Sequence, residues 1–292
     1  MSVAKPAQIL EEAGNIGILR AQTPIAQTLS LSFLAGAYIA FGAMLMITVV
    51  AGLPPDIFGT LAKFIGGALF PIGLIMVIIG GADLFTGDIL YGTVGAVQRK
   101  ISVPSVAKNW LYSYVGNLFG ALFIAYFMSV ATGLFTVDPW LNWIQKTALA
   151  KTNLSFYEAF WRGVGCNWLV CLACWLAIAS DNVIGKIAGI WFLIMAFVTM
   201  GFEHSIANMF FIPLGIFTGA PVSWTQFWLN NELPVTLGNI VGGSLFCGVA
   251  YLISYGKNTA SRIKVNNLSK DYVLEKHVKS PQRSTAANEF IG

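Results

Sequence analysis

Six stretches of this 292-residue chain are apolar, free of charged residues and long enough to cross a bilayer. A helix rises 1.5 Å per residue, so about 20 apolar residues cross the roughly 30 Å of hydrocarbon. The stretches are residues 29–53, 64–82, 109–137, 163–180, 187–202 and 233–256. Only 10% of the residues are charged, against about 25% in ordinary globular chains. We therefore predict an all-α integral membrane protein and exclude a soluble domain with a single anchor, a disordered chain and a nucleic-acid binder.

The positive charges predict how the chain is oriented. Six spans place both termini on one side, and that side would carry thirteen Lys and Arg residues against four on the other. Cytoplasmic loops are rich in Lys and Arg, so we expect a multi-pass protein of the plasma membrane with cytoplasmic termini. We divide the chain into an N-terminal segment (1–27), a six-span pore domain (28–255) and a C-terminal tail (256–292).

An internal repeat links spans two and five. Gly81-Ala-Asp-Leu-Phe-Thr-Gly-Asp88 aligns with Gly201-Phe-Glu-His-Ser-Ile-Ala-Asn208, and Gly116-Asn117 in span three aligns with Gly238-Asn239 in span six at nearly the same offset. Each copy holds three spans, an odd number, so the second copy must enter the membrane upside down. We predict an inverted 3+3 repeat, residues 28–137 and 156–255, in which helices two and five are broken at the bilayer midplane.

The breaks place three carboxylic acids and a histidine at mid-membrane depth. An ionisable group at mid-membrane costs at least about 2.5 kcal/mol, yet the breaks hold Asp83, Asp88, Glu203 and His204. We interpret the three acids and Asn208 as groups that stabilise the loops by accepting or making hydrogen bonds with freed backbone amides and with each other.

His204 is the candidate for function, because its counterpart in the first repeat is Leu84 and symmetry does not require it. A histidine can stay neutral in a dry constriction and take up a proton when an anion approaches. Half-helix N-termini beside it would favour a small anion. Thr86 supplies a hydroxyl in the first break, and the sequence leaves open whether it serves the pore or bonds back to its own helix.

Apolar side chains near the breaks are candidates for constrictions, although such residues are more often core or lipid-facing. They are Phe70, Leu74, Phe85, Phe197 and Phe202. The four cysteines, two of them in the C-x-x-C of Cys171 and Cys174, have no second pair or nearby histidine to complete a metal site. We expect buried free thiols, no metal and no cofactor.

The two broken segments, residues 80–88 and 201–209, closely resemble the signature loops of the formate/nitrite transporter family. The resemblance also covers Lys151, Asn167 and Gly238-Asn239, and it extends over about residues 28–255. It implies an aquaporin-like six-helix protomer, a homopentamer with one pore in each protomer, and passage of small monovalent acids such as formate. It also implies that the first 27 residues form a cytoplasmic helix of the kind that shutters pores in this family.

The resemblance assigns roles to individual residues. His204 matches the central pore histidine, Thr86 its partner, and Lys151 with Asn167 an outer vestibule pair that attracts anions. Leu74 with Phe197 would form one apolar constriction, and Phe70 with Phe85 the other.

The resulting prediction is a channel or transporter for small monovalent anions, most simply formate, in which His204 shares a proton with the anion. Nitrite and hydrosulfide transport within the same family remain alternatives, as does symport with protons. A water or glycerol pore is disfavoured because neither break contains Asn-Pro-Ala. An enzyme is disfavoured because Ser205 lies in no G-x-S-x-G motif and no second histidine is near.

Overall fold

The computed structural model describes residues 3–256, and every regular element in that range is helical. Six helices are long and apolar enough to cross a membrane: Ile25–Val50, Leu61–Gly80, Val103–Val130, Phe156–Ala179, Val183–Met200 and Trp224–Gly256. The predicted all-α membrane fold with six spans is therefore confirmed. The predicted tail lies, from residue 257 onward, outside the described residues.

The first half of the chain contains one helix across the end of the bundle and three spans. Its elements are α1 (Pro6–Gln22), α2 (Ile25–Val50), α3 (Pro55–Phe58), α4 (Leu61–Leu69), α5 (Ile72–Gly80), α6 (Phe85–Val97), α7 (Val103–Phe123) and the π-helical η1 (Ile124–Val130). The second span is kinked between α4 and α5 at Pro71, because proline cannot continue the helical hydrogen bonding.

The second half repeats this order with a short helix in front. Its elements are α8 (Trp140–Thr152), α9 (Phe156–Ala179), α10 (Val183–Met200), α11 (Ser205–Phe217), α12 (Trp224–Gln226), the π-helical η2 (Phe227–Glu232), α13 (Leu233–Val241) and the π-helical η3 (Gly242–Val249). The sequence did not indicate α8, and the sixth span begins nine residues earlier than predicted. The run Asn230-Asn231-Glu232 hid that start, because three polar residues interrupt the apolar pattern.

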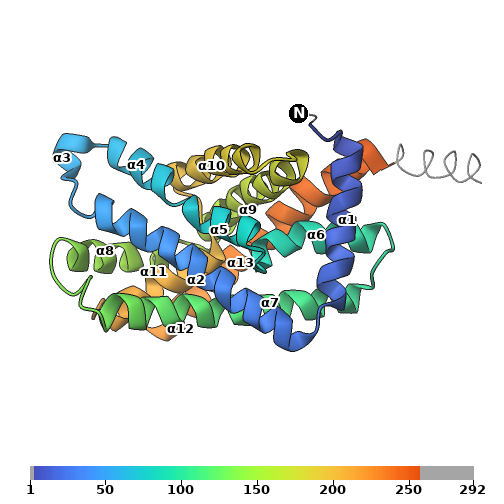
Figure 1. Ribbon diagram of the computed structural model, residues 1–292. Helices are drawn as coiled ribbons and strands as arrows, with labels where there is room; N and C mark the ends of the chain where they lie inside the picture. Colours follow the sequence, from blue (N-terminus) through green and yellow to red (C-terminus); the bar gives the residue numbers. More distant parts are fainter. Residues whose placement is uncertain (1–2, 257–292) are drawn as a thin grey trace, which may run out of the picture.

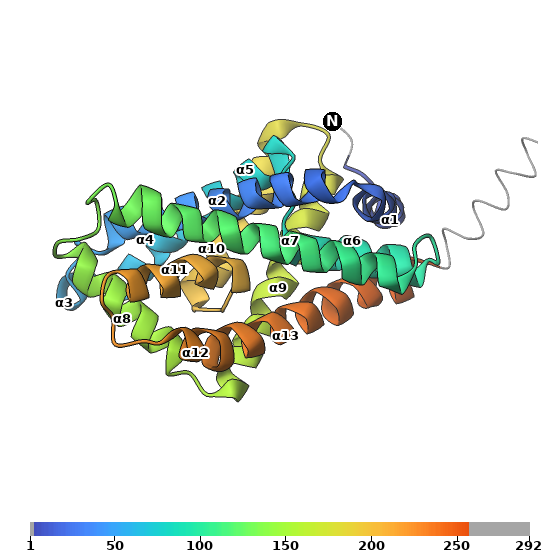
Figure 2. The ribbon, with the colours of Figure 1, turned by 90° about the horizontal axis from the view of Figure 1, so that it is seen from below.

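The two breaks share one backbone geometry. Helix α5 ends on Gly81 (φ 77°, ψ 25°) and α10 on Gly201 (φ 76°, ψ 32°), a left-handed conformation that glycine adopts without a steric penalty. Three residues later α6 begins after Leu84 (φ −109°, ψ 119°) and α11 after His204 (φ −112°, ψ 116°). Helices α6 and α11 leave the centre of the bundle toward opposite ends (Figures 1 and 2). This arrangement is the predicted inverted repeat.

Glycines allow the long helices of each half to approach closely. A Cβ on Gly36 of α2 would collide with the carbonyl of Asn117 on α7, and a Cβ on Gly120 of α7 with that of Phe33. In the second half, Gly238 of α13 lies against the carbonyl of Phe160 on α9 in the same way. These glycines therefore pack helices within one protomer.

Helix α1 lies across the end of the bundle at which the chain also reaches residue 256 (Figures 1 and 2). It buries Ile9, Leu10 and Ala13 in a small core shared with Leu90 and Val94 of α6. The helix expected within the first 27 residues is thus present and packed on α6.

Candidate functional site

The two broken segments meet at a hydrogen bond in the middle of the bundle. We call residues 81–84 the first loop and residues 201–204 the second loop. The Thr86 hydroxyl, on the first turn of α6, lies 2.9 Å from Nε2 of His204, the last residue of the second loop. Both side chains are buried. The structure therefore joins the two residues that the sequence placed in separate repeats.

The hydrogen bonds of His204 define its protonation. Its Nδ1 accepts the backbone N–H of Ala207 at 3.1 Å, so the imidazole caps the N-terminus of α11. A ring nitrogen that accepts a hydrogen bond carries no proton, so the neutral ring has its proton on Nε2. His204 therefore donates from Nε2 to the Thr86 oxygen. Leu84, its counterpart, has no side-chain acceptor and caps nothing.

Asn117 of α7 satisfies the freed backbone groups of the first loop. Its Oδ1 accepts the N–H of Phe85 at 3.0 Å, and its Nδ2 donates to the carbonyls of Ser32 (2.8 Å) and Asp83 (3.0 Å). The side chain is fully buried.

Asn239 of α13 repeats this arrangement in the second loop. Its Oδ1 accepts the N–H of Ser205 at 3.0 Å, and its Nδ2 donates to the carbonyls of Gly163 (2.8 Å) and Glu203 (3.0 Å). The prediction that carboxylates accept the freed amides at the starts of α6 and α11 is wrong, because asparagines from the third helix of each repeat accept them. The Gly-Asn repeat in the sequence was the signal for this role.

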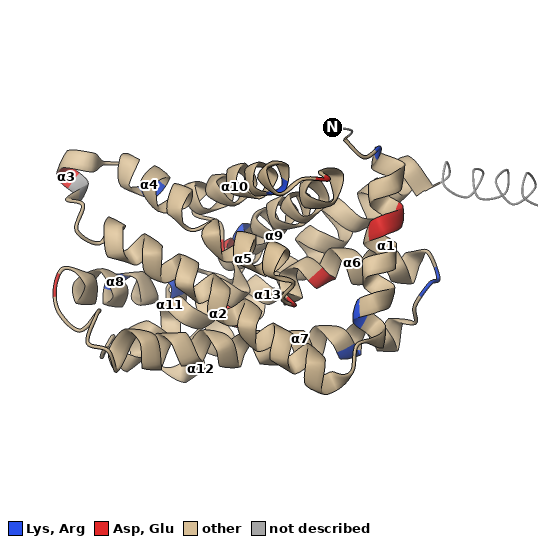
Figure 3. Ribbon diagram, viewed as in Figure 1, with Lys and Arg blue, Asp and Glu red and all other residues tan. Residues whose placement is uncertain are grey.

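The acids pair with cations instead. Arg20 of α1 lies 3.4 Å from Asp83 and 3.6 Å from Asp88, and it donates to the carbonyl of Ala82 at 3.0 Å. Glu203 accepts both contacts of Lys151, at 2.9 and 3.0 Å. Figure 3 shows these few charges inside a bundle whose spanning helices are otherwise largely uncharged. Each loop thus has one cation from outside the broken helix.

Asn208 bonds the second loop to η2. Its Nδ2 donates to Glu203 at 2.7 Å and to Oδ1 of Asn231 at 2.7 Å, and Asn231 in turn donates to the carbonyl of Lys151 at 2.9 Å. The Lys151–Glu203 pair is therefore fixed to η2 by two amides.

An apolar neck closes around His204. A cavity of only about 10 Å³, room for about one water molecule, is lined by Phe70, Leu74, Leu84, Phe197 and His204, together with Ile39, Val170 and Ile194. The ring of Phe197 stacks on His204 at 6.0 Å and meets Phe70 edge-on at 6.1 Å. Leu84 and Val170 were not identified from the sequence, because neither differs there from an ordinary core residue.

Phe85 does not belong to this neck. Its ring packs against Tyr114 at 5.1 Å and Trp110 at 6.3 Å, both on α7. The predicted pairing of Phe70 with Phe85 is therefore wrong, because the first residue of α6 turns its side chain toward α7 while Thr86 faces His204. Phe70, Leu74 and Phe197 line one neck rather than two separate constrictions.

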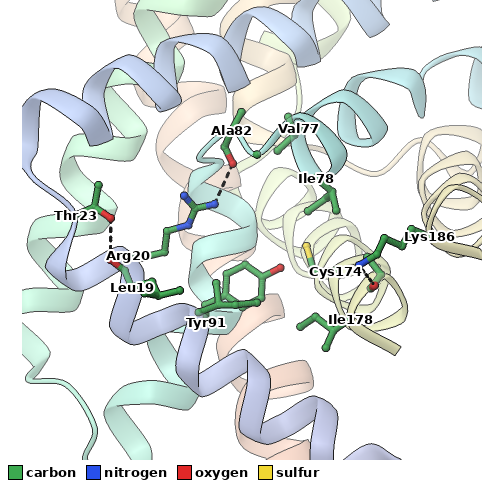
Figure 4. Close-up of a pocket in the computed structure, with 13 residues that line it drawn as sticks. Leu19, Arg20, Thr23, Val77, Ile78, Ala82, Tyr91, Cys174, Ile178 and Lys186 are labelled. Carbon is green, nitrogen blue, oxygen red and sulfur yellow. Dashed lines mark hydrogen bonds between the residues drawn. The ribbon is translucent and has the colours of Figure 1, made fainter. Parts of the chain in front are cut away.

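Cavities adjoin the neck toward both ends of the bundle. The α8-side cavity, about 160 Å³, is lined by Phe70, Phe197, Phe202, His204 and Lys151 among others. It shares Met46, Trp143 and Val198 with a wider cavity of about 460 Å³ that Lys63 and Lys146 also line. At the other end the α1-side cavity, about 320 Å³, is lined by Arg20, Thr23, Val77, Tyr91 and Lys186. Figure 4 shows Arg20 reaching across it to Ala82.

Lys151 and Asn167 occupy different environments. Lys151 lines the α8-side cavity but is paired with Glu203. Asn167 is fully buried and donates to the carbonyls of Thr86 (3.2 Å) and Asn239 (2.8 Å), so it holds the two repeats together. Of the expected vestibule pair, Lys151 lines a cavity, whereas Asn167 lines none of the cavities described above.

The cysteines behave as small apolar residues. All four are buried and unpaired, and the residues that the structure describes contain no group of His, Cys, Asp and Glu fit to hold a metal ion.

Comparison with known proteins places the chain among transporters. The formate/nitrite transporter family model matches residues 7–253. The chain is 48% identical to the probable formate transporter of Methanothermobacter thermautotrophicus, over 88% of this chain and 98% of that protein. It is 35% identical to the formate channel FocA of Escherichia coli (strain K12), over 86% and 94%.

Two solved structures share the fold. One, described as an FNT family ion channel, has a TM-score of 0.79 and 32% identity, covering 85% of this chain and 98% of its own. The other, a pentameric formate channel with formate bound, has a TM-score of 0.71 and 32% identity, covering 79% and 97%.

Proposed function

The chain belongs to the formate/nitrite transporter family, and from this premise we propose that it carries small monovalent anions, formate foremost, across the plasma membrane through a pore within each protomer. The family consists of channels and transporters rather than enzymes, in agreement with the sequence prediction. Two relatives named as formate transporters or channels support formate over nitrite or hydrosulfide.

The observation that carries the proposal is the Thr86–His204 hydrogen bond at the neck. Phe70, Phe197 and His204 line both the neck and the α8-side cavity. On the opposite side, Leu74 of the neck is one helical turn from Val77 of the α1-side cavity. The neck between the two cavities is therefore lined by apolar side chains and by His204, whose ring bonds the Thr86 hydroxyl.

Proton sharing lowers the desolvation free energy of an anion that crosses the neck. A bare carboxylate that leaves water for apolar walls loses its hydration, whereas neutral formic acid pays far less. The Nε2–H of His204 donates a hydrogen bond to the anion, either directly or through the Thr86 hydroxyl. A proton on Nδ1 would displace the Ala207 cap, which is worth on the order of 1 kcal/mol. An anion opposite the ring favours the cation: Nδ1 takes up a proton from water, Nε2 passes its own proton to the carboxylate, and neutral formic acid leaves a neutral ring behind.

Lys151 is the cation nearest to this step in the α8-side cavity. An anion arriving there shares Lys151 with Glu203, so the lysine offers a hydrogen-bond donor more than a free positive charge. Arg20 and Lys186 line the cavity at the other end.

The assembly and orientation follow the same reasoning. We propose a homopentamer, supported by the similarity to a pentameric formate channel. The termini are assigned to the cytoplasm, because the side that holds them is richer in Lys and Arg.

Formate uptake into proteoliposomes tests this function. We expect saturable uptake that unlabelled formate abolishes, with weaker competition by nitrite and hydrosulfide, and no glycerol-driven swelling above empty liposomes. Swelling in glycerol without formate uptake would overturn the proposal in favour of a neutral-solute pore. Stronger competition by nitrite or hydrosulfide than by formate would reassign the substrate within the family.

A further inference from the structure

We propose that Glu232 of η2 is a second proton-binding site in the membrane, separate from His204, and that it holds a proton at neutral pH. Glu232 lies in the sixth span and is completely buried. Neither the pore nor the loop supports described above use its side chain.

The hydrogen bonds of Glu232 are those of a carboxylic acid. The hydroxyls of Tyr114 (2.8 Å) and Thr236 (3.2 Å) both donate to Oε1. Oε2 is buried and has no hydrogen-bond partner among the described residues. One oxygen thus takes both donors, as a carbonyl oxygen does, and the other is left to carry the proton.

The surrounding charges do not replace that proton. Within residues 3–256 no cation forms an ion pair with Glu232, and the nearest charged side chains that act on it are Glu203 and Lys151, already paired with each other. Tyr114 of α7 is the titratable group that bonds to it. Helices α8 and α9 also pack on η2. Their titratable side chains include Lys146 and Lys151 of α8 and Tyr157, Glu158, Arg162 and Cys166 of α9, and no hydrogen bond or ion pair joins any of these to Glu232 within the described residues. Helices α11, α12 and α13 contribute no titratable side chain. An ionised carboxylate without a partner is costly in such a place, so the neutral acid is favoured.

Glu232 is linked to residues that flank both breaks. Its chain neighbour Asn231 is bonded to Asn208 and to the Lys151 carbonyl, which support the second loop. Its partner Tyr114 packs on Phe85, the residue before Thr86. Loss of the proton would place a negative charge between the loops and repel an anion at the neck. Repulsion between like charges is strong in the low dielectric of a protein interior, so anion occupancy of the neck should fall.

Infrared difference spectroscopy tests the site without relying on transport. Protonated carboxyl groups have a C=O stretch that ionised ones lack. We expect proteoliposomes of the wild type at neutral pH to show such a band, Glu232→Gln to lose it, and Glu158→Gln, which changes an exposed glutamate of α9, to keep it. If Glu232→Gln does not fold, Tyr114→Phe serves instead: removing the donor should shift the band to higher frequency. Identical bands in wild type and variant at every pH would overturn the assignment.

The second arm rests on the proposed function. At alkaline pH, formate flux should fall further in the wild type than in Glu232→Gln, which mimics the protonated state. Suppose that the infrared band is lost in Glu232→Gln but formate flux has the same pH profile in the wild type and the variant. Glu232 would then hold a proton without affecting the pore, and the proposed effect on the pore would be overturned. Absence of formate flux in both proteins would instead count against the proposed substrate and leave the infrared result standing.

Discussion

His204 makes two hydrogen bonds from one ring, and each depends on the other. The Nδ1 cap of α11 places the proton on Nε2, and Nε2 then meets Thr86 from the opposite repeat. Ser, Thr, Asp and Asn are the usual N-cap residues, so a histidine in this position indicates a second task for the ring. That task is to present a donor in the neck.

Replacing Thr86 with Val keeps the shape of the side chain and removes its hydroxyl. We expect formate flux to fall roughly fivefold, because one hydrogen bond of about 1 kcal/mol is lost at the neck. Thr93→Val is the matched control, since Thr93 lies on the same helix and its hydroxyl bonds Ser244. Equal fluxes in the two variants, measured in proteoliposomes, would contradict a role for Thr86 in the pore.

At this scale the sequence predicts unusual residues well and ordinary ones poorly. Glu203 and His204 attract notice because ionisable groups are rare in spans. Leu84 and Val170 line the same neck, yet in the sequence nothing distinguishes them from ordinary core residues. The contact between Arg20 and Asp83 could not be predicted from the sequence. The two residues are 63 positions apart, and they meet only because of the way α1 packs on the bundle.

The broken helices depend on their glycines and on two asparagines. A left-handed residue ends α5 and α10, and an asparagine from the third helix accepts the first free N–H of α6 and α11. The loops are therefore fixed by neighbouring helices rather than by their own side chains.

Ala in place of Gly81 or Gly201 measures the cost of the left-handed turn. No atom lies within 4 Å of a Cβ at either position, so the penalty of roughly 1–2 kcal/mol is purely conformational. Gly80→Ala is the control: it lies inside α5 with only an ordinary contact to Tyr38, and it should stabilise by up to about 1 kcal/mol. Thermal unfolding in detergent should show that Gly81→Ala and Gly201→Ala are less stable than the wild type and that Gly80→Ala is not. A Gly201→Ala variant as stable as the wild type would contradict the left-handed turn.

Asn117→Ala tests the support of the first loop. The change leaves the N–H of Phe85 and the carbonyl of Asp83 unpaired, at about 1–3 kcal/mol for each buried group. We expect a marked loss of thermal stability. Asn109→Ala, on the same helix, removes an amide nitrogen that has no hydrogen-bond partner among the described residues and should cost less. Similar losses in both would argue against this support.

Apolar runs predicted the spans because a segment long enough to cross the hydrocarbon core must consist mostly of apolar residues. The prediction lost accuracy where polar side chains pair across the bundle: Asn231 and Glu232 bond to Asn208 and Tyr114, partners invisible in a local pattern. The inverted repeat was predictable because two patterns recur in register: a glycine followed two residues later by an acid, and the pair Gly-Asn. The orientation of the Phe85 side chain was not predictable, since the first residue of a helix can face either the pore or the neighbouring helix, here α7.

For the whole molecule, Arg20 ties α1 to the pore domain. Burial alone would lower the pKa of this guanidinium, but the charges of Asp88 and Asp83 outweigh it and raise the pKa above its ordinary value. A raised pKa means that the stabilisation is present at every pH below the ordinary value and is lost only above the raised one. The docking of α1 should therefore not weaken between neutral and moderately alkaline pH.

Arg20→Gln should release this tie. Two buried carboxylates lose their cation, which we expect to cost about 2–3 kcal/mol, since Arg20 stays partly solvent-exposed. Limited proteolysis should then cut near α1 faster than in wild type, whereas Lys5→Gln, at the start of the same helix, should not change the rate. Equal cleavage of Arg20→Gln and wild type would show that apolar packing alone holds the helix.

The account of the pore as a whole depends on proton sharing at His204, and formate flux with and without a pH gradient tests it most directly. His204→Asn keeps an acceptor for the Ala207 N–H but has no proton to share, and His204→Phe removes both. We predict that both variants lose the response of flux to the gradient while His204→Asn keeps wild-type thermal stability. A gradient response in His204→Asn equal to that of the wild type would contradict the account.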